Sequence, residues 1–363
     1  MTKYSWKKIP IIAIATIFIL VLVACGGGTE ETEGSTEEAS SEESSTSGEV
    51  IDLTVSSFMP GPHPQHKDVI EPFLERVEEA TDGRVTGTMY PANALGESDA
   101  QYDLAVTGVA DMSMTLHGYT PGEFPLSSVT ELPFMGENAV DGTRIFWDLH
   151  EQFPEIAEEH EGTKIAWIFK NDAAQLFSVD NPINNWEDLE GMRIRTPSPA
   201  GTELLEAYGA IPVSMPMGDV YEAMQRGVVD GALGPASTIT NFQLGDVMNY
   251  ITKGDFYTSS LMVVINESTW NRISPEDQEV IEELMDREMA LLAGETYDKD
   301  GDGGWTAAEE AGIEINELSD EEIEEWAKPL ESISEEWVEE MEGNDLPGQA
   351  IYEAAVESRD QGE

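Results

Sequence analysis

Two arginines with strand-like spacing are the residues of this chain best suited to binding an anion. Arg193 and Arg195 stand in the segment LEGMRIRTPSP, where they alternate with apolar Met192 and Ile194 before two prolines. This alternation predicts a strand with both guanidinium groups on one face. A guanidinium offers two parallel donors to a carboxylate and keeps its charge when water is excluded. We therefore expect one arginine at the mouth of a cleft and the other paired with an acid.

The charge of the chain narrows its class of partner. The 363 residues include 73 acidic and 18 basic ones, for a formal net charge of -55. So negative a chain is not expected to bind nucleic acid or anionic lipid surfaces. The acidity is also typical of a protein adapted to a saline or alkaline habitat. An anion could bind such a chain only where its few positive groups are concentrated and shielded.

Another segment, residues 298–309, has the spacing of calcium ligands. The segment DKDGDGGWTAAE has oxygen-bearing side chains at EF-hand positions, namely Asp298, Asp300, Asp302, Thr306 and Glu309. Gly304 and Trp305 replace the usual central residues of such a loop. The alternative is an acidic, solvated helix. The sequence leaves the choice between calcium and a helix open, and we assign no metal ligand and no cofactor.

Motifs for catalysis are missing from the sequence. It contains no GxSxG, no HExxH and no GxxxxGK segment, and its one cysteine, Cys25, lies in a segment of another kind. Neighbouring glutamates carry little information in a chain this acidic, although a glycosidase would need two such carboxylates. We expect a binding protein and not an enzyme.

The N-terminal residues have the layout of an export signal. Three lysines precede an uncharged apolar run, residues 9–23, which is short for a transmembrane helix and ends at Cys25. Residues 22–25, Leu-Val-Ala-Cys, resemble a bacterial lipobox, which implies cleavage after residue 24 and a lipid on Cys25; the alternative is a buried free cysteine. Residues 25–49 are acidic and almost free of apolar side chains, which predicts a disordered tether. The expected location is the outer face of the cell membrane.

The remaining residues alternate between strand and helix patterns. Strands are expected near 51–59, 84–90, 111–115, 164–169, 192–196, 212–216, 227–233 and 260–266, and helices near 67–81, 102–106, 201–208 and 218–225, before an acidic and largely helical last third. Such alternation predicts α/β layers with parallel strands. About 310 residues are enough for two domains.

Several of these segments together resemble a transporter family. YPANALGESDAQYDLAVTGVADMSM, ELPFMGENA and NPINNWEDLEGMRIRTPSPAGTELLEAYGAIPVSMPMGDVYEAMQRGVVDGALGP are similar to the solute-binding subunits of tripartite ATP-independent periplasmic (TRAP) transporters. The resemblance covers roughly residues 50–340. Its most specific part is the ordered series of the arginine strand, Gly-Ala-x-Pro-Val, Val-Tyr-Glu-Ala-Met-Gln and Gly-Val-Val-Asp-Gly.

The resemblance implies a fold and a function. The fold is a two-domain, periplasmic-binding-protein-like α/β structure with crossing strands and a long connecting helix. Domain I would comprise residues 50–172 and 262–305, and domain II residues 173–261 and 306–350. Members bind small organic acids, often through the arginine at the position of Arg195, and deliver them to a small and a large membrane subunit that use an ion gradient. A lipoprotein presenting a carboxylate to a sensor or receptor is the alternative.

The resemblance also indicates further ligand-binding positions. Where members have a second arginine or an asparagine, this chain has Gln175 and Gly234, and the loss of these polar contacts predicts a monocarboxylate. Loop positions after strands add two histidines, for which ordinary loop positions are the alternative. A methionine and a tyrosine, which could equally belong to the core, complete the set. The expected ligand-binding residues are Arg195, Gln175, His63, His117, Met217, Tyr221 and Gly234, with Phe256 and Tyr257 as weaker candidates.

Overall fold

The computed structural model describes residues 50–362. The export signal, Cys25 and the acidic tether lie outside the described residues. Within residues 50–362, none of the helices combines the length and the apolar character needed to cross a bilayer.

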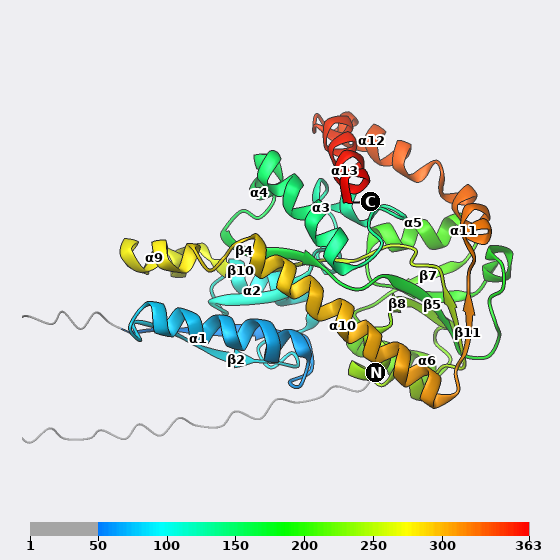
Figure 1. Cartoon of the computed structure of the whole chain (residues 1–363), viewed down its shortest axis with the longest axis horizontal. Helices are drawn as coiled ribbons and strands as arrows, with labels where there is room; N and C mark the ends of the chain where they lie inside the picture. The colour runs from blue at the N-terminus through cyan, green and yellow to red at the C-terminus, as the bar shows by residue number, and fades with distance from the viewer. Residues whose placement is uncertain (1–49, 363) are drawn as a thin grey trace, which may run out of the picture. The chain divides into compact units, whose positions relative to one another are not determined.

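The first sheet has five strands in the order β2-β1-β3-β10-β4 (Figure 1). Its strands are β1 (Ile51–Ser57), β2 (Val85–Tyr90), β3 (Met112–Leu116), β4 (Thr163–Lys170) and β10 (Ser260–Asn266). β1 pairs in parallel with β2 and β3, whereas β10 runs antiparallel to both of its neighbours, β3 and β4. The expectation of parallel strands is therefore wrong for β10, which enters the sheet from the opposite direction.

The second sheet has six strands in the order β11-β9-β5-β8-β6-β7. Its strands are β5 (Ala174–Ser178), β6 (Arg193–Thr196), β7 (Ile211–Ser214), β8 (Gly231–Pro235), β9 (Tyr250–Lys253) and β11 (Glu314–Glu317). The arginine strand β6 lies between β7 and β8 and is parallel to both. β5 is antiparallel to β8 and β9, so this sheet is mixed as well.

Helices cover both sheets. The α-helices are α1 (Glu71–Ala80), α2 (Gln101–Val106), α3 (Ala139–Gln152), α4 (Pro154–Glu158), α5 (Pro199–Ala207), α6 (Val220–Gln225), α7 (Ser237–Asn241), α8 (Glu267–Trp270), α9 (Pro275–Glu282), α10 (Arg287–Ala311), α11 (Asp320–Ala327), α12 (Ile333–Gly343) and α13 (Gly348–Gly362). Shorter helical segments are η1 (Gln65–Ile70), η2 (Ser98–Ala100), η3 (His117–Tyr119), η4 (Ser127–Glu131), η5 (Trp186–Leu189), η6 (Met217–Asp219), η7 (Leu244–Asp246) and η8 (Lys328–Leu330).

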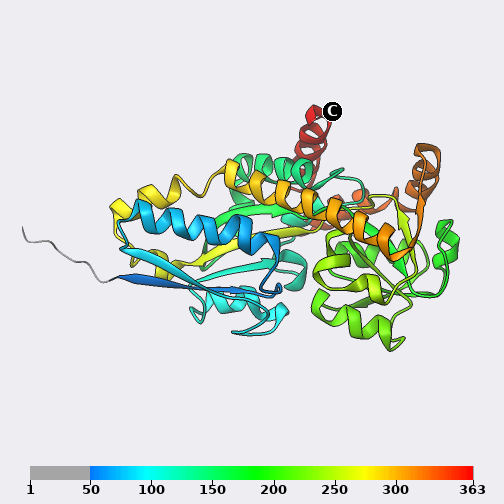
Figure 2. The same ribbon diagram turned by 60° about the horizontal axis from the view of Figure 1, so that its bottom comes forward.

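The chain crosses between the two sheets several times. It leaves the first sheet after β4 and enters the second at β5, and it returns from β9 to β10. Helix α10 makes a further connection, because it packs on β4 at one end and on α7 near the other (Figure 2). Apolar side chains fill the spaces below the helices; for example, Phe73 of α1 meets Trp167 of β4 with ring centroids 5.0 Å apart.

The long helix α10 contradicts the calcium-loop hypothesis. Asp298, Asp300 and Asp302 lie within this continuous 25-residue helix and not in a loop. Asp298 accepts hydrogen bonds from the backbone N–H groups of Ala139 and Val140 at the start of α3. Asp300 accepts one from the side chain of Asn241. Within residues 50–362, no set of three metal-ligating side chains is arranged to hold an ion.

The glycines that mimicked the calcium motif have a packing role. A Cβ at Gly304 would overlap the backbone oxygen of Ala236, just before α7, and a Cβ at Gly301 would lie 2.8 Å from a carboxylate oxygen of Asp172. Glycine inside a helix costs about 1 kcal/mol relative to alanine. Here it permits close contact between α10 and the elements of the second sheet, while the helix stays continuous.

Candidate ligand-binding site

Arg195 is buried at the end of β6, with 1% of its surface exposed. Its Nε donates to the backbone oxygen of Met215 at 2.9 Å, and its Nη1 donates to that of Leu233 at 3.1 Å. These two bonds fix the plane of the guanidinium. The Nη2 atom is also buried and makes no hydrogen bond of good geometry to a described residue, although the hydroxyl of Tyr119 lies close to the guanidinium. The arginine therefore keeps a donor nitrogen for a group that the protein itself does not supply.

Arg195 lines a small cavity between elements of the two sheets, which we call the arginine cavity. Its volume is about 30 Å³. The lining comprises Phe58, Met59, His63, Leu116, Tyr119, Asn171, Arg195, Pro197, Met217, Pro235, Ser237, Thr238, Phe242, Ser259 and Tyr297. No carboxylate belongs to this set, and no described residue forms an ion pair with Arg195. The burial of this charge lowers the pKa of Arg195, which remains a cation at neutral pH.

Two further polar side chains of the cavity come from the ends of strands in the first sheet. Asn171 follows β4, and its Oδ1 accepts from the backbone N–H of Ser259 at 2.7 Å, which leaves its Nδ2 as a donor. Tyr119 follows β3, and its Oη accepts from the backbone N–H of Met217 at 2.9 Å. Burial raises the pKa of Tyr119, so its hydroxyl stays protonated at neutral pH. The polar groups therefore suit one anionic group.

Aromatic and apolar side chains make up much of the remaining wall. Phe58 and Tyr119 meet edge to face with ring centroids 5.3 Å apart, and Tyr297 meets His63 at 5.8 Å. Phe242 and Met217 add apolar surface. Rings arranged in this way pack well against a planar apolar ligand.

Three of the predicted ligand-binding residues come together at Arg195. His63 and Met217 line the cavity, and Gly234 lies directly beside it, because a Cβ there would be 3.2 Å from Cε of Met217. Burial lowers the pKa of His63 to about 3, with a smaller contribution from His66. His63 is therefore a neutral ring at physiological pH and adds no positive charge.

Gln175 lies outside the lining of the arginine cavity. Its Nε2 donates to Asp255 Oδ1 at 2.6 Å and to the Ala173 oxygen, and its Oε1 accepts from the backbone N–H groups of Gly254 and Asp255. These bonds hold the segment that leads from β9 toward β10. With both ends of its amide engaged, Gln175 positions this crossing segment.

His117 and Tyr221 also lie away from Arg195. His117 is buried at the end of β3 and contacts His160 through the two Nε2 atoms, 3.0 Å apart. Tyr221 is half-buried on α6, where it packs on the core of the second sheet. Of the weaker candidates, Phe256 and Tyr257 are buried in the segment between β9 and β10, outside the cavity lining.

Arg193 is the arginine that pairs with an acid. Its guanidinium forms an ion pair with Asp230 at 2.6 Å, and its Nε reaches the same carboxylate. Both side chains are about 40% exposed. The paired charges make Arg193 a structural contact near the surface and leave Arg195 as the unpaired member.

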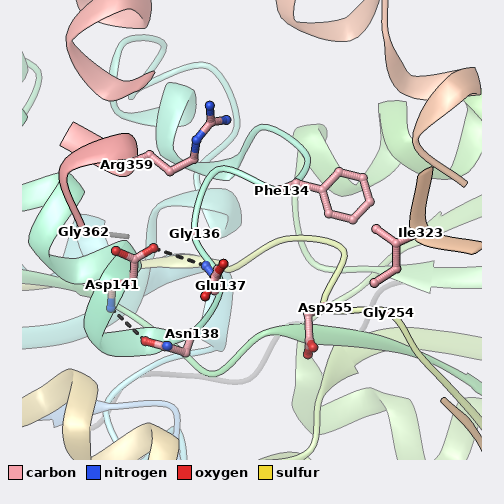
Figure 3. Close-up of a pocket in the computed structure, with 10 residues that line it drawn as sticks. All are labelled: Phe134, Gly136, Glu137, Asn138, Asp141, Gly254, Asp255, Ile323, Arg359 and Gly362. Carbon is pink, nitrogen blue, oxygen red and sulfur yellow. Dashed lines mark hydrogen bonds between the residues drawn. The ribbon is translucent and has the colours of Figure 1, made fainter. Parts of the chain in front are cut away.

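A larger groove lies elsewhere, beside the start of α3. It has a volume of about 640 Å³ and is lined by residues that include Glu137, Asp141 and Asp255 (Figure 3). Arg359 is the one basic residue among those that line it, and it pairs with the adjacent Asp360. Its three carboxylates disfavour an anionic ligand, so size alone does not identify the site.

Asn171 and Tyr119 were not expected from the sequence. Both follow a strand of the first sheet, at the sheet edge where open α/β folds place their ligands. The rule that ligands bind beyond the carboxyl ends of strands led to the prediction of His63 and His117. Applied to every polar residue that follows a strand, the rule would also have predicted Asn171 and Tyr119.

Comparisons with known proteins place the chain in a family. A model of the DctP family, described as bacterial extracellular solute-binding protein, family 7, matches residues 55–340. The ectoine-binding periplasmic protein TeaA of Halomonas elongata is 25% identical over 281 residues, which are 74% of this chain and 79% of TeaA.

Solved structures agree in fold. A TRAP periplasmic solute-binding protein of Bordetella bronchiseptica, with bound (R)- and (S)-mandelate, is 28% identical with a TM-score of 0.81 and covers 86% of this chain and 100% of its own. A TRAP solute-binding protein of Rhodoferax ferrireducens, in complex with copurified benzoate, is 25% identical with a TM-score of 0.82 and covers 86% and 98%. These likenesses confirm the predicted two-domain α/β fold, whose exact domain bounds stay a prediction. With a family model matched over most of its length, the chain belongs to the DctP family of TRAP solute-binding proteins.

Proposed function

We propose that this protein captures a small aromatic monocarboxylate in the arginine cavity and delivers it to a TRAP permease. The observation that carries the proposal is the buried, unpaired guanidinium of Arg195 with a free Nη2. Burying an unpaired charge costs several kcal/mol. A ligand carboxylate would offset that cost and accept the hydrogen bond that no described residue accepts.

The number of charged groups supports a single carboxylate. Arg195 is the one cation that lines the cavity, because burial keeps His63 neutral. Hydrogen bonds to charged groups contribute about 1.5–3 kcal/mol each, so two bonds from Arg195 and one from Asn171 approach the roughly 8 kcal/mol of a micromolar affinity. A second carboxylate would find no matching cation.

The aromatic side chains that line the cavity support an aromatic ring as the rest of the ligand. Phe58, Tyr119 and Tyr297 give the cavity a lining that suits a ring. The similar proteins of Bordetella bronchiseptica and Rhodoferax ferrireducens hold mandelate and benzoate, which are aromatic monocarboxylates.

The size of the cavity implies that its walls move. A volume of about 30 Å³ is on the order of that of one water molecule. A ligand of benzoate size therefore enters only when the elements of the two sheets separate, and its higher affinity for the closed state drives the closure. Delivery would occur at the outer face of the membrane, where a lipid on Cys25 holds the chain.

The test is calorimetric titration of the full chain, purified in mild detergent, with benzoate and with phthalate as the matched dicarboxylate. Arg195→Gln is compared with Arg193→Gln, which removes the same charge from a surface pair. We expect wild type and Arg193→Gln to bind benzoate alike, Arg195→Gln not to bind it, and phthalate to bind much more weakly. Equal binding by the two variants would exclude the assigned site, and tight phthalate binding would exclude the monocarboxylate preference.

A further inference from the structure

A second cavity lies beside His117, and we call it the glutamate cavity. It has a volume of about 160 Å³. Its lining joins the segment from β3 to η4 with the start of α5 and with α12. None of the residues that line the arginine cavity belongs to it. It is therefore a separate site that the capture of an acid on Arg195 does not use.

The inner end of this cavity contains a buried carboxylate. Glu131 is 4% exposed, and its Oε1 accepts from the backbone N–H and the hydroxyl of Ser260, at 2.8 and 2.6 Å. Its second oxygen, Oε2, makes no hydrogen bond to a described residue. The charge of Glu131 acts on the buried Lys170, which donates to the backbone oxygen and hydroxyl of Thr130 and forms no direct ion pair with any described residue. Glu131 thus keeps an oxygen for an external donor.

His117 is a second buried polar residue in the lining of this cavity. Nδ1 of His160 faces the backbone oxygen of Ile156 at 3.0 Å and must carry a proton, so Nε2 of His160 accepts from Nε2 of His117. Burial and the neighbouring His160 hold the pKa of His117 well below its usual value. Its Nδ1 is buried and makes no hydrogen bond of good geometry, although the backbone of Ser260 lies close enough to act against the lowering of the pKa. The register that pairs Leu116 with Leu261 brings His117 beside Ser260, the residue bound to Glu131.

The rest of the lining has the polarity of a site for a cation. Glu203 of α5 and Glu340 of α12 stand at the exposed end, and no lysine or arginine belongs to the lining. Burial and the charges of Glu340 and Glu336 raise the pKa of Glu203, which shows that negative charge accumulates there. The walls between the two ends are apolar and include the rings of Phe124 and Trp337. Aromatic faces attract organic cations.

We infer that the glutamate cavity binds a small organic ammonium compound with at least one N–H group. The ammonium donates to Glu131 Oε2, and its apolar chain lies against Phe124 and Trp337. A quaternary ammonium has the charge but no proton to donate, so it would leave Glu131 Oε2 unpartnered. The cavity is lined by η4, which packs near the first sheet, and by α5, which packs near the second. Its occupant therefore contacts elements that belong to both sheets.

The experiment is titration of the full chain with n-butylammonium chloride, using tetramethylammonium chloride and n-butanol at the same concentrations. Glu131→Gln is the test variant, since its amide oxygen can still accept from Ser260. Glu321→Gln, which removes the same charge from an exposed position on α11, is the matched control. Binding of benzoate to each variant shows whether the fold and the arginine cavity are intact.

We expect saturable binding of n-butylammonium to wild type and Glu321→Gln, and a loss of roughly ten- to a hundredfold in affinity in Glu131→Gln, the value of one charged hydrogen bond. n-Butanol and tetramethylammonium should bind much more weakly. Equal affinities for n-butylammonium and tetramethylammonium would indicate attraction to the acidic surface alone and overturn the proposal. So would equal binding by Glu131→Gln and Glu321→Gln, or no binding to a wild type that binds benzoate.

Discussion

The two cavities have opposite polarity although they lie in the same acidic chain. The arginine cavity contains one buried cation and no carboxylate, whereas three glutamates and no lysine or arginine line the glutamate cavity. The net charge of -55 therefore does not set the sign at either site. Individual buried groups set it, because a charge removed from water acts over short distances with little screening. What a cavity accepts depends on which of its charges the protein leaves unpaired.

The strongest way to break this contrast is to place a carboxylate in the arginine cavity. Asn171→Asp keeps an oxygen to accept from Ser259, but its charge pairs with Arg195 and repels the ligand. We expect benzoate affinity to fall by at least about a hundredfold, since like charges brought together cost several kcal/mol. Calorimetry measures this loss. Asn171→Ala removes the bond to the ligand and the bond from Ser259 but adds no charge, so it should cost about tenfold. Equal effects of the two variants would contradict the electrostatic explanation.

Gly304→Ala should disturb the packing behind the arginine cavity but not that behind the glutamate cavity. Gly304→Ala directs a methyl group at the Ala236 oxygen, just before α7, whose Ser237 and Thr238 line the arginine cavity. Overpacking of this kind costs about 1–3 kcal/mol, so the free energy of unfolding in urea should fall by that amount.

The adjacent Gly303 provides the control. A Cβ there has nothing within 4 Å, so Gly303→Ala should stabilise the helix by up to about 1 kcal/mol. Benzoate binding should weaken in Gly304→Ala while n-butylammonium binding stays unchanged. If both ligands were affected equally, the two cavities would not be independent.

A smaller effect is expected from Arg195→Lys, which keeps the charge of the arginine cavity. Lysine cannot reproduce the planar arrangement in which Nε and Nη1 bind the oxygens of Met215 and Leu233. Benzoate affinity should fall by about tenfold, or ~1.4 kcal/mol. An unchanged dissociation constant would mean that charge alone, and not orientation, holds the acid.

The smallest predicted effect is a pH dependence confined to the glutamate cavity. Burial lowers the pKa of Lys170 to about 7, although Glu131 acts in the opposite direction. Between pH 6 and 8 Lys170 loses its proton, so the charge of Glu131 becomes less compensated and n-butylammonium affinity should rise a few-fold. His117, whose pKa lies well below its usual value, stays neutral throughout. Titrations at both pH values should show a much smaller rise in Lys170→Gln; an equal rise in the variant would contradict the role of Lys170.

Short-range patterns predicted most of the elements correctly and drew attention to one residue, Arg195, whose binding role stays a prediction. The alternation before Pro197 and Pro199 identified β6, and the scarcity of arginine drew attention to Arg195. The ordered motifs predicted the family and, through it, the two-domain fold that the solved structures confirm.

The sequence left a choice open, or placed a residue away from its structural neighbours, where a residue type serves two physical purposes. In α10 the Asp-Gly spacing of a calcium loop produces close helix packing, because glycine suits both a tight turn and a near contact. Gln175 and His117 stand at plausible positions along the chain, but hydrogen bonds to Asp255 and His160 decide where they point. Asp255 is 80 residues from Gln175, and His160 is 43 residues from His117, so neither contact produces a pattern in the neighbouring sequence.

Gly118 has a consequence for the time course of ligand exchange. A Cβ at this position would overlap the side chain of Ser198, so the turn after β3 and the start of α5 touch almost backbone to backbone. No ligand atom need be near this contact for it to matter. A side chain at position 118 would keep the two turns apart and shorten the lifetime of the closed state, which would speed the release of cargo without altering any group that recognises it.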